Sequence, residues 1–200
     1  MTKEQFMRII DIITKEEWIN NYEFFRDFKN SAYFDKLLDA YENLNTDILF
    51  KSDIHGQDHI ERVIFYCFVL SWKYDLDNDD TDIMKYAASL HDTKRENDGW
   101  DTNHGKRAAE QSIGYADIKE ENIPILQAII TAHSDDDGYI EDIIKAYEVR
   151  DFDRALFLAK LFKDADGLDR VRINRLDPKY LRNDFSNDLV DFAYDLYEHY

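Results

Sequence analysis

The 200-residue chain contains little glycine, proline or cysteine, and each shortage excludes a class of protein. Six glycines and two prolines are too few for the many turns of a sheet-rich fold, which favours long helices. Because Cys67 is the only cysteine, an internal disulfide and a thiolate zinc cluster are excluded, and a cytoplasmic location is expected. The sequence has no uncharged apolar run of about 18 residues, which argues against a membrane span.

Basic residues are also scarce. Lys and Arg number 25 against 43 Asp and Glu, which gives a formal net charge of -18. A chain this acidic is repelled by phosphate backbones, so nucleic acid is not an expected partner. Residues 150–182 are the exception, with nine Lys and Arg against six acids. This local excess is either a solvated helix face or an anion site.

Helical periodicity is present along the whole chain, and strand signals are weak. The pattern predicts an all-α fold, with a first helix around Phe6 and Ile9. We divide the chain into a helical extension over residues 1–50, a central unit over residues 51–182 and a C-terminal helix over residues 183–200. The last segment carries an apolar stripe that packs onto the domain or, as the alternative, forms a homodimer interface. Its residues are Phe185, Leu189, Phe192, Ala193, Leu196 and Tyr200.

Most of the histidines lie in one part of the chain, between residues 55 and 133. His59 and His133 fall on apolar stripes of predicted helices, and His91 with Asp92 ends another predicted helix. Asp166 continues an apolar stripe, so its carboxylate is expected to be buried and to need a partner. A divalent cation is one such partner. A salt bridge to an arginine and a simple polar helix end are the alternatives.

Four stretches follow one another in the order "HGQDHIERV", "LHDTKRENDGWDTNHGKRAAE", "TAHSDDDG" and "KDADGLDRVRI". Together they resemble the HD-domain metal-dependent phosphohydrolases, a superfamily named for its His-Asp doublet. The resemblance covers residues 52–180 and implies an HD-domain-like helical bundle. By position, it implies that the metal ligands are His59, His91, Asp92 and Asp166. It further implies that a second metal or a phosphate is bound by His104 and His133, whereas His55 is a weaker candidate.

The residues after the doublet depart from the family pattern. Many relatives have Ile-Gly-Lys or Ile-Gly-Arg there, whereas this chain has Thr-Lys-Arg, so Arg95 alone aligns with the family's cation. Asp98, in "ENDG", is carried over from a less characterised branch. The expected catalytic residues are Lys94, Arg95 and Asp98. We expect cations that hold phosphate at Lys106, Arg107, Arg170 and Arg172, and we expect Asp169 to support a metal ligand.

These features lead us to expect a metal-dependent phosphohydrolase whose substrate is a nucleotide or another small phosphate ester. Monoester, diester and pyrophosphate cleavage are all open. The cofactor would be one or two divalent ions, Mn, Fe, Ni, Co or Mg, because no thiolate ligand is available. One alternative is a regulatory module that binds metal and nucleotide without turnover, and a purely structural helical protein is another.

Overall fold

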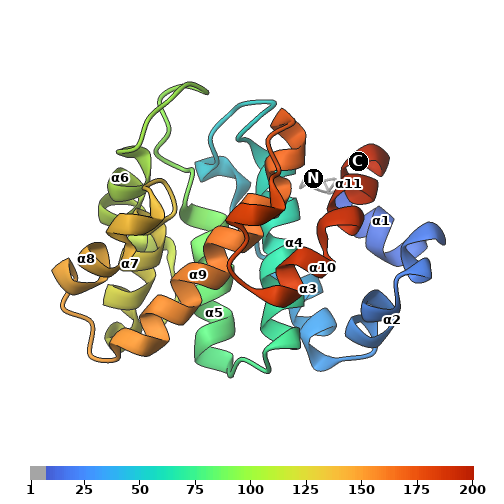
Figure 1. Ribbon diagram of the computed structural model, residues 1–200, viewed down its shortest axis with the longest axis horizontal. Coiled ribbons are helices and arrows are strands. Elements are labelled where there is room, and N and C mark those ends of the chain that lie inside the picture. The colour runs from blue at the N-terminus through green and yellow to red at the C-terminus, as the bar shows by residue number, and fades with distance from the viewer. Residues whose placement is uncertain (1–7) are drawn as a thin grey trace, which may run out of the picture.

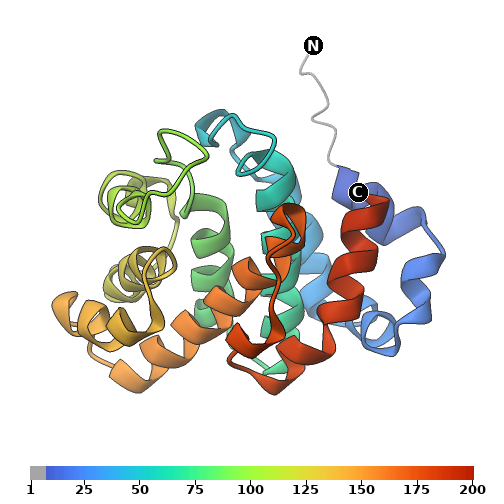
Figure 2. The ribbon, with the colours of Figure 1, turned by 45° about the horizontal axis from the view of Figure 1, so that its top comes forward.

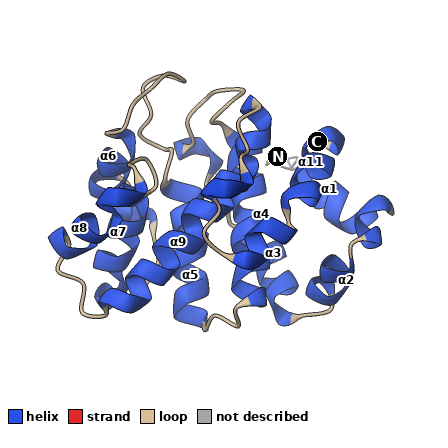
Figure 3. Ribbon diagram, in the orientation of Figure 1, coloured by secondary structure: helices blue, strands red, loops and turns tan. Residues whose placement is uncertain are grey.

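Helices are the only regular secondary structure in residues 8–200, the part of the chain that the computed structural model describes (Figures 1 and 3). The all-α prediction is therefore confirmed, while Phe6 lies outside the described residues. The α-helices are α1 (Arg8–Lys15), α2 (Glu23–Lys29), α3 (Ala32–Glu42), α4 (Gln57–Lys73), α5 (Asn78–Leu90), α6 (His104–Gln111), α7 (Ile123–Ala132), α8 (Ile140–Ala146), α9 (Phe152–Leu168), α10 (Asp184–Asp188) and α11 (Val190–His199). Short 3-10 helices connect them: η1 (Trp18–Asn21), η2 (Thr46–Ile48), η3 (Ile113–Tyr115), η4 (Glu120–Asn122), η5 (Asp137–Tyr139), η6 (Asp169–Ile173) and η7 (Pro178–Tyr180).

Helix α4 is the centre of the bundle. Every residue from His59 to Ser71 is buried, as expected for a helix that neighbours enclose on all sides. It packs against α5 and α9 on one side and against α3 and α1 on the other (Figures 1 and 2). Buried apolar residues from Ile9 to Leu196 belong to one continuous core, so the segments 8–50 and 183–200 share the core of the central unit.

Helices α6 and α7 form a tightly packed pair beside α5. Gly105 permits this approach, since a Cβ atom there would lie 2.6 Å from the carbonyl oxygen of Ile130 and 2.6 Å from Oγ of Ser134. Contact distances this short are not tolerated between atoms that are not bonded. The missing side chain therefore lets the first turn of α6 lie against the last turn of α7.

Some helix boundaries differ from the periodicity. Helix α5 begins at Asn78, because the Asp77 carboxylate accepts a hydrogen bond from the Asp80 amide at 2.8 Å and caps the helix. The last segment, expected as one helix, is divided at Leu189 into α10 and α11. The apolar stripe of this segment is buried in the core from Phe185 to Leu196, so these residues pack within the chain.

No helix in residues 8–200 has the length and the low polarity needed to cross a membrane.

Candidate metal centre

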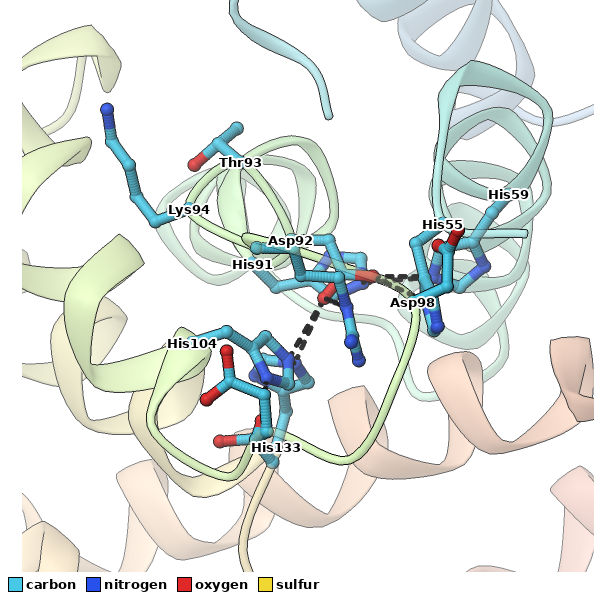
Figure 4. Close-up of polar contacts among 12 residues, drawn as sticks. His55, His59, His91, Asp92, Thr93, Lys94, Asp98, His104 and His133 are labelled. Carbon is cyan, nitrogen blue, oxygen red and sulfur yellow. Dashed lines mark hydrogen bonds and ion pairs between the residues drawn. The ribbon is translucent and has the colours of Figure 1, made fainter. Parts of the chain in front are cut away.

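The ends of several helices meet at a cluster of imidazoles and carboxylates (Figure 4). His59 lies in the first turn of α4, the His91-Asp92 doublet ends α5, and His104 begins α6. His133 ends α7, and Asp166 lies in the last turn of α9. The side chain of Asp166 is 23% exposed. The other five side chains are buried: His59, His91, Asp92, His104 and His133. Groups that are distant in the sequence therefore lie together in one cluster.

One half of the cluster contains the four residues predicted as metal ligands. Nε2 of His59 lies 3.1 Å from Nε2 of His91. Oδ2 of Asp92 is 3.6 Å from the first of these nitrogens and 3.7 Å from the second. Oδ1 of Asp166 is 3.5 Å and 4.0 Å from the same two atoms. His59, His91 and Asp166 thus offer ligand atoms close enough together to hold a single cation, and Asp92 shares a similar grouping with each of the two histidines.

The other half of the cluster uses the second oxygen of the same carboxylate. Oδ1 of Asp92 is 3.0 Å from Nε2 of His104 and 3.6 Å from Nε2 of His133. The two imidazole nitrogens are 2.9 Å apart. Asp92 therefore lies between two groups of histidines, as Figure 4 shows, and its two oxygens face opposite groups.

The protonation of these imidazoles follows from what their Nδ1 atoms contact. A backbone carbonyl can only accept a hydrogen bond, so an Nδ1 atom that contacts one carries the proton. In the neutral ring, Nε2 then has a free lone pair. The carbonyl acceptors are those of Ala88 for His91, Asp101 for His104 and Ile130 for His133. Paired Nε2 atoms consequently present lone pairs to each other, and a cation is the partner that satisfies both.

The pKa values agree with this assignment. Burial lowers the pKa of His59 and of His133 to about 4, so both imidazoles are neutral near pH 7. Burial would raise the pKa of Asp166, but Coulomb attraction to the protonated forms of His59 and His91 outweighs it, and the net shift is downward. The pKa of Asp92 is likewise well below its ordinary value, because the surrounding imidazoles outweigh burial. Ionised carboxylates beside imidazole nitrogens form a donor set that fits a divalent cation.

Asp169 supports the first half of the cluster from behind. Its side chain is fully buried, and Oδ2 accepts a hydrogen bond from Nδ1 of His59 at 2.7 Å. Nε and Nη2 of Arg62 donate to the two Asp169 oxygens at 2.5 and 3.1 Å. Burial would raise the pKa of Asp169, but the charge of Arg62 lowers it on balance. Arg62 was not among the predicted site residues. The signal that could have identified it is a cation one turn after His59 on a largely apolar helix.

His55 also joins the cluster. Its Nδ1 atom lies 3.0 Å from Oδ2 of Asp92 and 3.1 Å from Nη2 of Arg172. Arg172, expected to hold phosphate, is already engaged within the chain, since its Nε donates to the Ile54 carbonyl at 2.8 Å and its Nη1 donates to the Asp169 carbonyl at 3.0 Å. The arginine therefore links the loop that carries His55 to η6.

The expected catalytic residues Lys94, Arg95 and Asp98 differ in whether they contact the cluster. Nε of Arg95 donates to Oδ1 of Asp92 at 2.9 Å, and its Nη1 is buried with no hydrogen-bond partner in the described part of the chain. The side chain of Lys94 extends away from the cluster in Figure 4. Asp98 is exposed and accepts a hydrogen bond from Oγ of Ser52 at 2.5 Å. Of these three residues, Arg95 alone contacts a predicted metal ligand.

The other expected phosphate-binding cations lie outside the cluster. Arg107 donates to the Asp101 carboxylate and, at 3.0 Å, to the Lys94 carbonyl. Lys106 is 63% exposed and pairs with Glu110 at 3.9 Å. Arg170 is exposed on η6. Among residues 8–200, none of Arg107, Lys106 and Arg170 forms a side-chain hydrogen bond or ion pair with a cluster residue.

Comparison of the chain with protein-family models, with curated proteins and with solved structures finds no match. The likeness to HD-domain phosphohydrolases remains a prediction from four sequence stretches. What the cluster can do must be inferred from its donor atoms and the groups around them.

Proposed function

We propose that this protein is a metal-dependent phosphohydrolase that acts on a nucleotide or another small phosphate ester. The proposal rests mainly on the Asp92 carboxylate, whose two oxygens face two pairs of imidazole nitrogens. One divalent ion would be held by His59, His91, Asp92 and Asp166. A second would be held by Asp92, His104 and His133. This mixture of nitrogen and oxygen donors suits Mn, Fe, Ni, Co or Mg.

A bound divalent ion lowers the pKa of water and polarises a phosphoryl oxygen. The protein's own residues prepare the site for this chemistry. Asp169 keeps the proton on Nδ1 of His59, so that Nε2 of that ring offers its lone pair to a metal ion. Arg95 is fixed by its Nε bond to Asp92, which leaves the buried Nη1 group to donate to a phosphoryl oxygen.

The charge distribution supports a small anionic substrate. Arg95 and Arg172 contact residues of the cluster directly, whereas the chain as a whole has a formal net charge of -18. A long polyanion would meet repulsion over most of the surface. A single phosphate compound can enter beside the two arginines without that repulsion.

Metal content and phosphate release test this function directly. The purified protein should contain a divalent metal, and a panel of nucleotides and sugar phosphates with Mn²⁺ or Mg²⁺ should identify a compound that releases phosphate. Asp92→Asn removes the shared carboxylate and should abolish both metal binding and turnover. Asp82→Asn is the matched control, because Asp82 lies on α5 but is 46% exposed and pairs with Lys85.

Two results would contradict the proposal. Phosphate release that persists in the Asp92→Asn protein would show that the cluster is not the reaction site. Stoichiometric metal and tight nucleotide binding without turnover, with every metal in the panel, would favour the regulatory module.

A further inference from the structure

The loop formed by residues 94–103 is held by side-chain contacts at Asp98, Asp101 and Thr102. On one side, Oγ of Ser52 donates a hydrogen bond to the Asp98 carboxylate at 2.5 Å. On the other side, Arg107 donates to Asp101, and Oγ of Ser134 donates to the Thr102 carbonyl at 2.7 Å. The loop lies next to the loop of residues 50–56 in both ribbon views (Figures 1 and 2). Its conformation is therefore fixed by contacts to two separate parts of the fold.

These contacts lead to both halves of the metal cluster. Ser52, which binds Asp98, also accepts a hydrogen bond from the His55 amide at 3.0 Å. Asp101 binds Nδ1 of His104 through its carbonyl. Residues 98 and 101 are thus attached to groups next to opposite ends of the cluster. Gly99 and Trp100 are the two residues between these anchored positions, so the backbone of Trp100 is next to the residue whose carbonyl binds His104.

Trp100 differs from the other two tryptophans. It is 90% exposed, whereas Trp18 stacks on His199 with ring centroids 4.3 Å apart and Trp72 packs against Phe28 at 5.9 Å. Within residues 8–200, Trp100 has no aromatic or cation–π partner in the structure. The exposed indole contributes nothing to the core. It offers a flat apolar face on which a ring of a ligand can stack.

We infer that Trp100 is a specificity-determining residue whose indole stacks on a flat aromatic ring of the substrate. This inference rests on the proposed phosphohydrolase function and narrows its substrate class to nucleotides. The cluster and Arg95 bind the phosphate, and the indole binds the base of the same molecule. Aromatic stacking accepts any base because each base has a π-face. The contact therefore selects nucleotides over sugar phosphates without selecting one base.

Steady-state kinetics of the metal-loaded protein test the inference. The nucleoside monophosphates are compared with ribose 5-phosphate, which has a phosphate but no flat ring. Trp100→Ala should raise the ratio of the nucleotide KM to the ribose 5-phosphate KM about 10- to 100-fold, the range into which stacking energies convert. Trp100→Phe should restore most of this ratio. Tyr180→Ala, which removes a 62% exposed aromatic side chain on η7, is the matched control and should leave the ratio unchanged.

Tryptophan fluorescence gives a second readout that does not need turnover. Binding of α,β-methylene ATP to the metal-loaded protein should quench the emission, and Trp100→Phe should remove that quenching. An equal KM change for nucleotides and ribose 5-phosphate in Trp100→Ala would overturn the inference while leaving the phosphohydrolase intact. If no compound is hydrolysed, the proposed function fails, and absent quenching would then overturn the inference as well.

Discussion

Replacing Arg62 with methionine removes the main cation that pairs with the buried carboxylate of Asp169. Arg62 is 3% exposed and Asp169 is fully buried, so the remaining carboxylate cannot gain compensation from water. Breaking such a pair by removing one partner costs about 3–5 kcal/mol. Asp169 keeps its bond to His59 and a contact with Nη1 of Arg172 at 3.4 Å. We therefore expect Arg62→Met to lower the free energy of unfolding by an amount at the lower end of this range, about 3 kcal/mol.

Urea and thermal denaturation in the presence of a chelator measure this loss without a contribution from metal. For a domain of this size, about 1 kcal/mol shifts the Tm by roughly 2–4 °C, so the Tm of Arg62→Met should fall by about 6–12 °C. The Tm of Arg62→Lys should lie between those of the unaltered protein and Arg62→Met, because lysine keeps the charge but not the two directed hydrogen bonds. The affinity for metal should also fall about 10- to 100-fold, since the support behind His59 is weakened.

The double variant Arg62→Met/Asp169→Asn separates the cost of the pair from the cost of an unpaired charge. It removes both charges, so it should be more stable than the sum of the two single variants implies. The ring of Tyr200 lies 4.5 Å from the Arg62 guanidinium, and methionine retains part of that packing. A loss of less than about 1 kcal/mol in Arg62→Met, or strict additivity in the double variant, would refute the reasoning.

Two further predictions concern α6 and Glu61. Gly105→Ala should separate α6 from Ile130 and Ser134, destabilise the protein by about 1–3 kcal/mol and lower the metal stoichiometry measured by titration. Gly114→Ala, whose Cβ meets no atom within 4 Å, should change stability by less than about 0.5 kcal/mol. Burial raises the pKa of Glu61, so the folded protein keeps a proton that the unfolded chain releases as the pH rises past the carboxyl's ordinary pKa. Stability should therefore fall as the pH rises through the raised pKa, and Glu61→Gln should flatten that slope in urea unfolding at a series of pH values.

Periodicity was sufficient to place the helices that build the site. The apolar faces around His59 and His133 indicated burial, and the structure buries both side chains. Pairings between helices were outside the reach of periodicity. The contact between His104 and His133 depends on the close approach that Gly105 allows, which is a property of two helices and not of either one.

The positions of Lys and Arg in the sequence did not predict which of these side chains are free to bind phosphate. Arg107 and Arg172 are both engaged by groups of the protein itself, the first by Asp101 and the second by Asp169. Loop conformation decides these pairings, and local sequence patterns do not encode it. Arg62 illustrates the opposite case, because a cation within a buried helix needs a buried acid. The sequence contained that signal, but the partner is 107 residues away.

The shared carboxylate of Asp92 also bears on how the two halves of the centre differ. The first half has a second carboxylate, from Asp166, whereas the second half adds only imidazoles to the shared oxygen. In the second half, Nε of Arg95 also binds that oxygen, at 2.9 Å, and partly neutralises it. Coulomb attraction for a divalent cation is therefore greater in the first half. Under the proposed function, we therefore expect Arg95 to weaken metal binding in the second half and to offer its buried Nη1 group to a phosphoryl oxygen.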